Sequence, residues 1–109
     1  MGSVVGTTRR AAYAQMRIVW TEPAIRDLAS ARAYIARDNP SASDRQVERV
    51  IAAVAGLLQF PEIGRPGRRP GTRELVISGT PYIAAYRARG DAVEILRVLH
   101  GRQRWPDTL

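Results

Sequence analysis

The sequence contains no cysteine and no lysine, and its only histidine is His100. Without cysteine there is no disulfide framework, no thiolate nucleophile and no Cys/His zinc site. This absence agrees with a reducing compartment, so we expect a cytoplasmic protein that needs no metal and no cofactor. No apolar run approaches the roughly 20 residues of a membrane-spanning helix, and we therefore expect no membrane partner.

Positive charge dominates the sequence. All 17 basic residues are arginines, and with 10 acidic residues they give a formal net charge of +7. A GC-rich genome would explain why arginine replaces lysine, but it would not explain the sign of the charge. A basic domain of this size attracts polyanions, which include nucleic acid, anionic surfaces and acidic protein segments. Arginine also binds phosphate and carboxylate groups bidentately.

The first 15 residues differ from the rest of the chain. They lack the apolar core of a secretion signal, and Gly6 breaks the myristoylation pattern. We interpret residues 1–15 as a flexible extension, or as the product of a start upstream of a natural one at Met16. Hydrophobic residues make up 45% of the 109, which is enough for one core, so we expect a single domain over residues 16–109.

The first half of that domain predicts a strand and two helices. The segment Arg17 to Trp20 is β-branched and aromatic, as in a strand. Apolar residues then recur at helical spacing over about 22–38, until Asn39-Pro40 ends the helix. Ser43 and the glutamine three residues later form a capping box, which predicts a second helix to about Gln59. The apolar stripes expected to face the core include Ile25, Leu28, Ile35, Val47, Val50, Ile51, Val54, Leu57 and Leu58.

The second half predicts a loop and three strands. Proline and glycine punctuate Phe60 to Thr72, which we interpret as a loop. Strands are expected over residues 73–77, 82–89 and 92–100, with Gly90-Asp91 as a tight turn. The last strand is apolar on both faces, which favours a central position. The order is β-α-α-β-β-β, an α+β fold with a helical hairpin packed on a small, mostly antiparallel sheet.

Most catalytic patterns are missing. The carboxylates are scattered, the serines lie in helix, cap or turn positions, and the glycines after Ile63 lack the lysine of a phosphate-binding loop. What remains is a set of basic side chains on the predicted sheet and the loop before it, where they could position phosphates. Tyr86 or Trp105 could stack on a base. The basic set comprises Arg65, Arg68, Arg69, Arg73, Arg87, Arg97, His100, Arg102 and Arg104.

Each of these residues also has a purely structural interpretation. Arg97 lies among apolar residues and would suit a buried ion pair with Glu74 or Glu94. His100 at a strand end would serve as a structural hydrogen-bonding group, and Trp105 would cover the core. Tyr82 and Tyr86 share one strand face and would belong to the core or line a groove. The loop arginines would form a solvated, charged surface.

Four fragments in order carry a family resemblance. They are FPEIGR at 60–65, REL at 73–75, the paired YI and YR on the strand from Tyr82, and the strand from Val93 that ends in LHG. With the order of elements, they resemble the ParE/RelE superfamily, toxins of bacterial type II toxin–antitoxin pairs. The resemblance covers Met16 to about Pro106. It implies a toxin.

The resemblance implies two classes of target. RelE-like members cut mRNA on the ribosome, and their catalytic residues would correspond here to Arg73, Arg87 and His100. ParE-like members inhibit DNA gyrase and trap cleaved DNA. Only His100 could act as an acid or base here, because arginine hardly ever deprotonates, and this favours a ParE-like, non-enzymatic protein. The residues expected to bind the target are Arg68, Arg69, Arg97, Arg102, Arg104 and Trp105.

Both classes imply a cognate antitoxin of the ParD or RelB type, whose partly disordered, acidic segment would fold onto the toxin. The two helices and the sheet edge are the expected docking surfaces. A third hypothesis is an inactive binding module, a toxin that has lost its activity.

Overall fold

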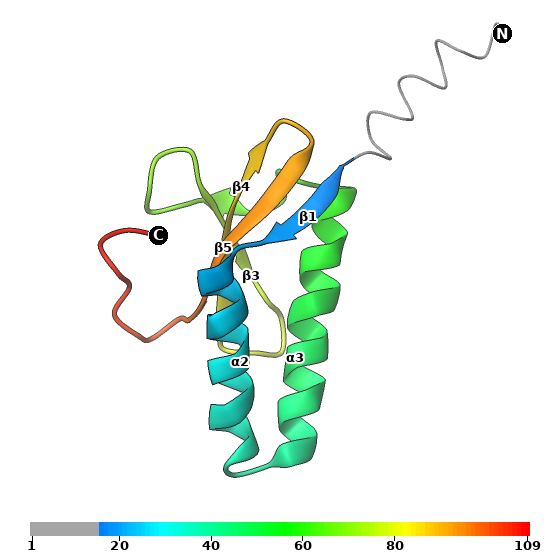
Figure 1. Ribbon diagram of the computed structural model, residues 1–109, viewed down its shortest axis with the longest axis vertical. Coiled ribbons are helices and arrows are strands. Elements are labelled where there is room, and N and C mark those ends of the chain that lie inside the picture. The colour runs from blue at the N-terminus through cyan, green and yellow to red at the C-terminus, as the bar shows by residue number, and fades with distance from the viewer. Residues whose placement is uncertain (1–15) are drawn as a thin grey trace, which may run out of the picture.

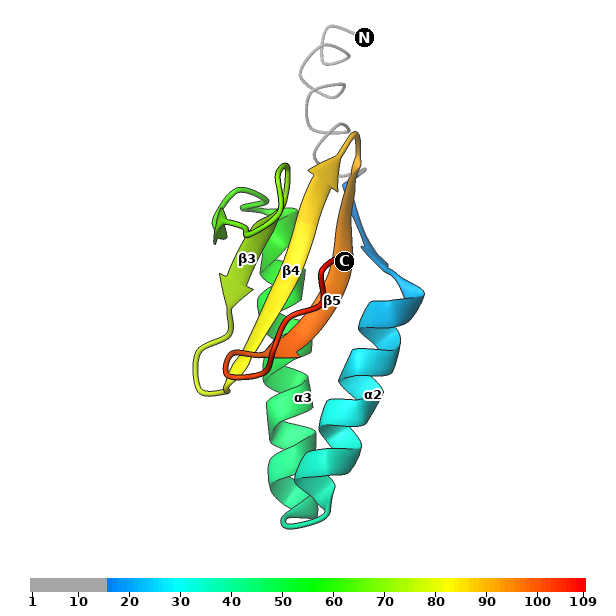
Figure 2. The ribbon, with the colours of Figure 1, turned by 90° about the vertical axis from the view of Figure 1, so that its left-hand side faces the viewer.

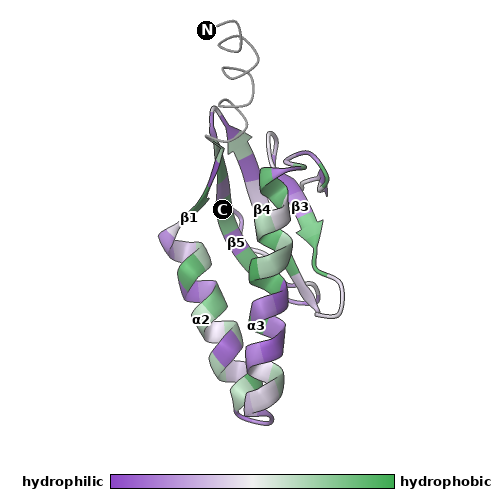
Figure 3. Ribbon diagram, turned by 90° about the vertical axis from the view of Figure 1, so that its right-hand side faces the viewer, coloured by the Kyte–Doolittle hydropathy of each residue, from purple (hydrophilic) through white to green (hydrophobic). Residues whose placement is uncertain are grey.

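The computed structural model describes residues 16–109, so the predicted N-terminal extension lies outside the described residues. Two helices cover one face of a five-stranded sheet, which confirms the predicted α+β fold (Figures 1 and 3). None of the helices in residues 16–109 has the length and apolar character needed to cross a membrane. The elements are β1 (Arg17–Trp20), α2 (Glu22–Ala36), α3 (Pro40–Ala55), the 3-10 turn η1 (Gly56–Leu58), β2 (Arg65–Pro66), β3 (Arg73–Val76), β4 (Tyr82–Arg89) and β5 (Ala92–His100).

The sheet has the strand order β1-β5-β4-β3-β2. β1 runs parallel to β5, and the other neighbours are antiparallel. The long β5 is an inner strand, as its two apolar faces predict. The predicted loop over residues 60–72 contains the short strand β2, whose Arg65 pairs with Glu74 of β3. The sequence did not predict this pairing, because a two-residue strand leaves no periodic pattern.

The second helix begins at Pro40, so the prediction of a start at Ser43 was wrong. Asn39 is the N-cap, and its side-chain oxygen accepts a hydrogen bond from the Ala42 N–H at 3.0 Å. An asparagine cap followed by proline in the first turn is a strong helix start. Ser43 is buried and donates instead to the carbonyl of Arg32 at 2.8 Å, which joins the two helices.

The core lies between the helical hairpin and the sheet. On α2 the buried stripe consists of Ala24 and Ala31, with Leu28 and Ile35 partly buried beside them. Ile25, predicted to face the core, is 54% exposed, and the predicted core residues Ile51 and Leu58 are exposed as well. Ala24 is buried in place of Ile25, so the buried stripe of α2 runs through Ala24, Leu28, Ala31 and Ile35.

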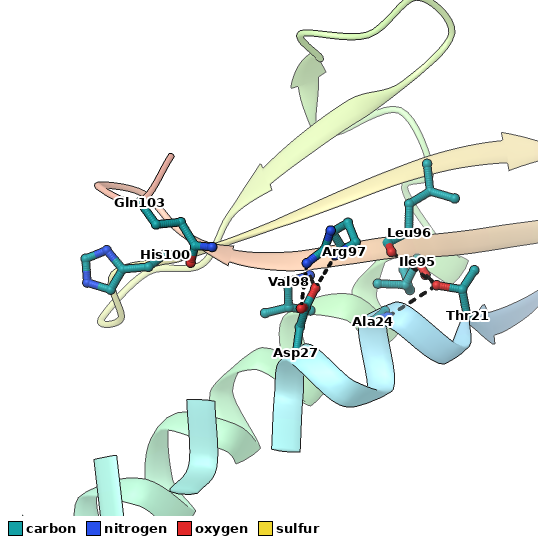
Figure 4. A network of polar contacts seen from close by, with 9 residues as sticks. All are labelled: Thr21, Ala24, Asp27, Ile95, Leu96, Arg97, Val98, His100 and Gln103. Atoms are coloured by element: carbon teal, nitrogen blue, oxygen red, sulfur yellow. Dashed lines mark hydrogen bonds and ion pairs between the residues drawn. The ribbon is translucent and has the colours of Figure 1, made fainter. Parts of the chain in front are cut away.

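Beyond the end of β1, the outer edge of β5 is closed by side chains of Thr21 and α2 and not by a strand. β1 accompanies β5 only as far as Ile95. Beyond that point the Thr21 hydroxyl donates to the Ile95 carbonyl at 2.7 Å, and Asp27 accepts the Val98 N–H at 3.0 Å (Figure 4). Side chains therefore satisfy backbone groups that a neighbouring strand would otherwise bind.

The same carboxylate of Asp27 binds the guanidinium of Arg97. Two hydrogen bonds of 2.6 and 2.9 Å join them, and only 16% of the Asp27 side chain and 22% of the Arg97 side chain is exposed. The bond to Asp27 raises the pKa of Arg97, which is therefore a fixed cation. The predicted partners of Arg97, Glu74 and Glu94, are both bound elsewhere. A β-bulge in β5 leaves Leu96 between the residues that pair with Tyr86 and Ala85, which changes the direction of Arg97.

Tyr86 fixes the loop that follows η1. Its ring is fully buried, and its hydroxyl donates to the Pro61 carbonyl at 2.8 Å and accepts from the Gly64 N–H at 2.9 Å. A Cβ at Gly64 would lie 2.6 Å from that hydroxyl, so only glycine fits there. Burial raises the pKa of Tyr86. Tyr86 is therefore a core residue, which confirms its structural interpretation and excludes the alternative that it stacks on a base.

We expect Asp27→Ala to lower the free energy of unfolding by about 2 to 4 kcal/mol, because it leaves the Arg97 cation and the Val98 N–H without partners. Urea denaturation followed by circular dichroism measures the change. Asp44→Ala is the matched control, since it removes the exposed Arg32–Asp44 pair and should cost under about 1 kcal/mol. Equal losses in the two variants would contradict the role given to Asp27.

We expect Tyr86→Phe to lower the free energy of unfolding by about 1 to 3 kcal/mol, because the Pro61 carbonyl and the Gly64 N–H lose a shared partner. Thermal denaturation of both proteins at one pH gives the comparison. Tyr34→Phe removes an exposed hydroxyl and should change stability by less than about 0.5 kcal/mol. A Tyr86→Phe protein as stable as its parent would show that the loop does not depend on this hydroxyl.

Candidate functional site

Residues 101–109 form a C-terminal arm over the sheet. The arm leaves β5 and runs across the face opposite the helices, back toward the loop that contains β2 (Figures 1 and 2). Ile83, Ala85 and Leu99 alternate with core residues along their strands, so they point to this second face, yet all three are buried. The Gly101 N–H donates to the Pro81 carbonyl at 2.8 Å and fixes the start of the arm.

The arm contacts the β2 loop through two arginines. The guanidinium of Arg68 lies over the Trp105 ring, 3.8 Å from its centroid, and Arg69 donates to the Pro106 carbonyl at 2.8 Å. Arg104 lines a hollow together with Trp105 and Pro106. We call this group the loop–arm surface, and its members are Arg65, Arg68, Arg69, Arg104 and Trp105.

One buried carboxylate organises the loop side of this surface. Glu74 is 3% exposed and accepts hydrogen bonds from the Arg65 guanidinium at 3.1 and 3.3 Å. Its other oxygen accepts the backbone N–H of Arg68 at 2.9 Å and lies 3.7 Å from the Arg68 Nε. The loop arginines are therefore held in place, in contrast to the alternative of a merely solvated, charged surface.

The three residues predicted as a RelE-like catalytic set do not come together. Arg73 donates to the carbonyls of Glu62 and Gly64, beside Tyr86. Arg87 is next to Tyr86 in β4 and so points to the other face, where it binds Glu94 at 2.6 Å. This bond lowers the pKa of Glu94.

His100 lies at the far end of the sheet, where it pairs with Tyr82. Tyr82 and Arg87 are five positions apart in β4, which corresponds to about 16 Å. The predicted common concave face for Arg73, Arg87 and His100 is therefore absent from residues 16–109. Alternation along the strands assigns these side chains to different faces and different ends.

The imidazole of His100 is already engaged. Its Nδ1 accepts the backbone N–H of Arg102 at 3.1 Å, so the neutral ring carries its proton on Nε2 and has no free lone pair for a general base. The ring packs edge-on against Tyr82 with centroids 5.7 Å apart. Together with Tyr34 of α2 they line a cavity of about 330 Å³, in which burial raises the pKa of Tyr82.

The predicted target-binding residues do not all lie in one place. Arg68, Arg69, Arg104 and Trp105 meet in the loop–arm surface, whereas Arg97 is bound by Asp27. Arg102 lies in the turn after His100 and is exposed.

Sequence reasoning missed Asp27, although a signal was present. Asp27 lies between Ala24 and Ala31, on the buried side of its helix. A carboxylate in such a position needs a cationic partner nearby.

Known proteins match this chain over most of its length. The model of the family described as "ParE toxin of type II toxin-antitoxin system, parDE" matches residues 18–105. "Putative toxin Y4kP" of Sinorhizobium fredii is 50% identical over 93 residues, which cover 85% of this chain and 96% of that protein. "Toxin RelE2" of Caulobacter vibrioides is 36% identical over 84 residues, which cover 77% and 93%.

A solved structure shows the same arrangement. A chain of the "Chromosomal ParDE TA system from P. aeruginosa" superposes with a TM-score of 0.72 and 29% sequence identity, over 79% of this chain and 96% of that one. The family match begins in β1 and ends at Trp105, so it includes the hairpin, the whole sheet and the start of the arm. The chain therefore belongs to the ParE toxin family of type II toxin–antitoxin systems.

Proposed function

We propose that this toxin inhibits DNA gyrase in the cytoplasm and is neutralised by a cognate ParD-like antitoxin. The observation that carries the proposal is that the residues needed for the alternative activity, mRNA cleavage, are engaged in other contacts and lie far apart. His100 has no free base nitrogen, Arg87 is paired with Glu94, and the two lie at opposite ends of the sheet. A protein without an assembled acid–base pair acts by binding, as a ParE-like inhibitor does.

The loop–arm surface is the proposed site of target binding. It projects from the sheet side of the molecule, away from the helical hairpin (Figure 2). Glu74 and the arm hold Arg65, Arg68 and Arg69 in place, so little conformational entropy is lost when a target binds these three side chains. Arg97 lines the same hollow as Arg104 and Trp105, but its charge is paired with Asp27 within the fold.

The antitoxin is proposed to occupy another part of the molecule. A chain of a ParDE toxin–antitoxin system shares this fold, and an antitoxin of that type needs exposed apolar surface on the toxin. α2 offers Ile25 and Tyr34, and the edge near β3 offers Val76, all of them exposed. An acidic segment folded on these groups would also be attracted by the net charge of +7.

A supercoiling assay with purified gyrase and relaxed plasmid tests the proposal. We expect the full chain to inhibit supercoiling and to cause linear, cleaved DNA to accumulate after protein digestion. Relaxation by a type I topoisomerase, at the same toxin concentration, should be unchanged, and it controls for simple coating of the DNA. No inhibition of gyrase at a molar excess of toxin would overturn the proposal.

Translating ribosomes test the alternative target. Primer extension on an mRNA incubated with ribosomes and the toxin should show no new ends, because Arg73, Arg87 and His100 are not assembled into an acid–base site within residues 16–109. Ribosome-dependent cleavage that disappears in His100→Ala would instead assign the mRNA interferase function.

A further inference from the structure

The loop–arm surface joins two segments that are far apart in the sequence. Arg65, Arg68 and Arg69 come from the loop around β2, and Arg104 and Trp105 come from the arm some 35 residues later. The stack of Arg68 on Trp105 and the bond from Arg69 to Pro106 hold the two segments together. The basic groups thus share one rigid platform, and they do not extend separately into solvent.

This platform keeps half of its positive charge. Among the described residues, Glu74 is the carboxylate that forms ion pairs with it, and this single group binds both Arg65 and Arg68. Asp107 adds one further negative charge at the rim of the hollow that Arg104 lines. Four arginines against two acids leave a net charge of +2 on the surface.

The arginines also keep free hydrogen-bond donors. The side chains of Arg65 and Arg68 remain about half exposed, at 54% and 50%. Arg69 uses one nitrogen, and its acceptor is a neutral carbonyl. Arg68 lies on the uncharged Trp105 ring, which orients the plane of the guanidinium without neutralising it. Guanidinium groups with fixed planes and free N–H donors match the geometry of phosphate oxygens.

We propose that the loop–arm surface binds the phosphodiester backbone of double-stranded DNA directly, so that the toxin contacts DNA as well as the enzyme that acts on it. The proposal rests on the proposed function, because gyrase presents duplex DNA beside any protein bound to it. The contacts are to phosphates and carry no base sequence specificity. Trp105 acts as a positioning residue, since it orients Arg68 and does not itself contact the DNA.

Fluorescence anisotropy of a labelled duplex with the full chain, without gyrase, tests the proposal. We expect the double variant Arg69→Ala with Arg104→Ala to bind about 10-fold more weakly, and its dependence of log K on log salt to be less steep by about 2. The charge-matched control is Arg37→Ala with Arg45→Ala, two exposed arginines on the helical hairpin. It should lose less than about 2-fold, and equal losses in the two doubles would overturn the proposal.

A second comparison leaves the charge unchanged. Trp105→Ala keeps every arginine but removes the ring under Arg68, and we expect binding to weaken about 3-fold, while Trp105→Phe, which keeps an aromatic platform, binds like the parent. Circular dichroism confirms that each variant is folded. Parent-like binding by Trp105→Ala would overturn the proposal, as would tighter binding of an RNA hairpin of the same length.

The outcome is separable from that of the gyrase assay. If gyrase is inhibited but the parent chain does not bind the duplex, the DNA-contact proposal is wrong and the proposed function stands. If the duplex is bound through this surface but gyrase is unaffected, the proposed function is wrong and the DNA contact stands.

Discussion

The carboxylate of Asp27 holds the two layers of this toxin together. β5 continues beyond the end of β1, and its open edge would otherwise expose backbone donors at the point where the helical hairpin meets the sheet. Asp27 accepts the Val98 N–H and neutralises Arg97 at the same place, so one side chain closes the edge and compensates a half-buried cation. Asp27 also lines the cavity beside His100.

Several of the acidic residues bind arginines within the fold, and these pairs determine where the positive charge is neutralised. Asp27 binds Arg97, Glu74 binds Arg65 and Arg68, and Glu94 binds Arg87. Arginines outnumber these partners, because there are 17 of them against 10 acids. Most of the other arginines in residues 16–109 are exposed, so water and a polyanionic partner can solvate them. A basic surface is thus a consequence of the composition, and the contacts of Glu74 and the arm decide where it forms.

The order of elements was predictable because periodicity, caps and turn residues are local, and the prediction of β-α-α-β-β-β was confirmed. Local patterns could not give the parallel position of β1 or the partner of Arg97, since Asp27 lies 70 residues away in sequence. The arginines of the site were identified one by one, but their grouping depends on strand register. Arg73 pairs with Tyr86 and Arg87 follows it, so the two point to opposite faces, and a shift of one residue in register would have placed both on one face. That register is set by the packed core, which no short segment specifies.

The inner position of β5 has a consequence for biosynthesis. This strand bonds to β1, the first strand of the fold, and to β4, yet it is the last strand to emerge from a ribosome. Until residues 92–100 have emerged, β1 has no neighbour, Asp27 has no cation and the hairpin has only part of a sheet to pack on. The loop–arm surface is completed later still, since Trp105 follows that strand. The sheet and the ion pair of Asp27 therefore cannot be complete before the end of β5 has emerged.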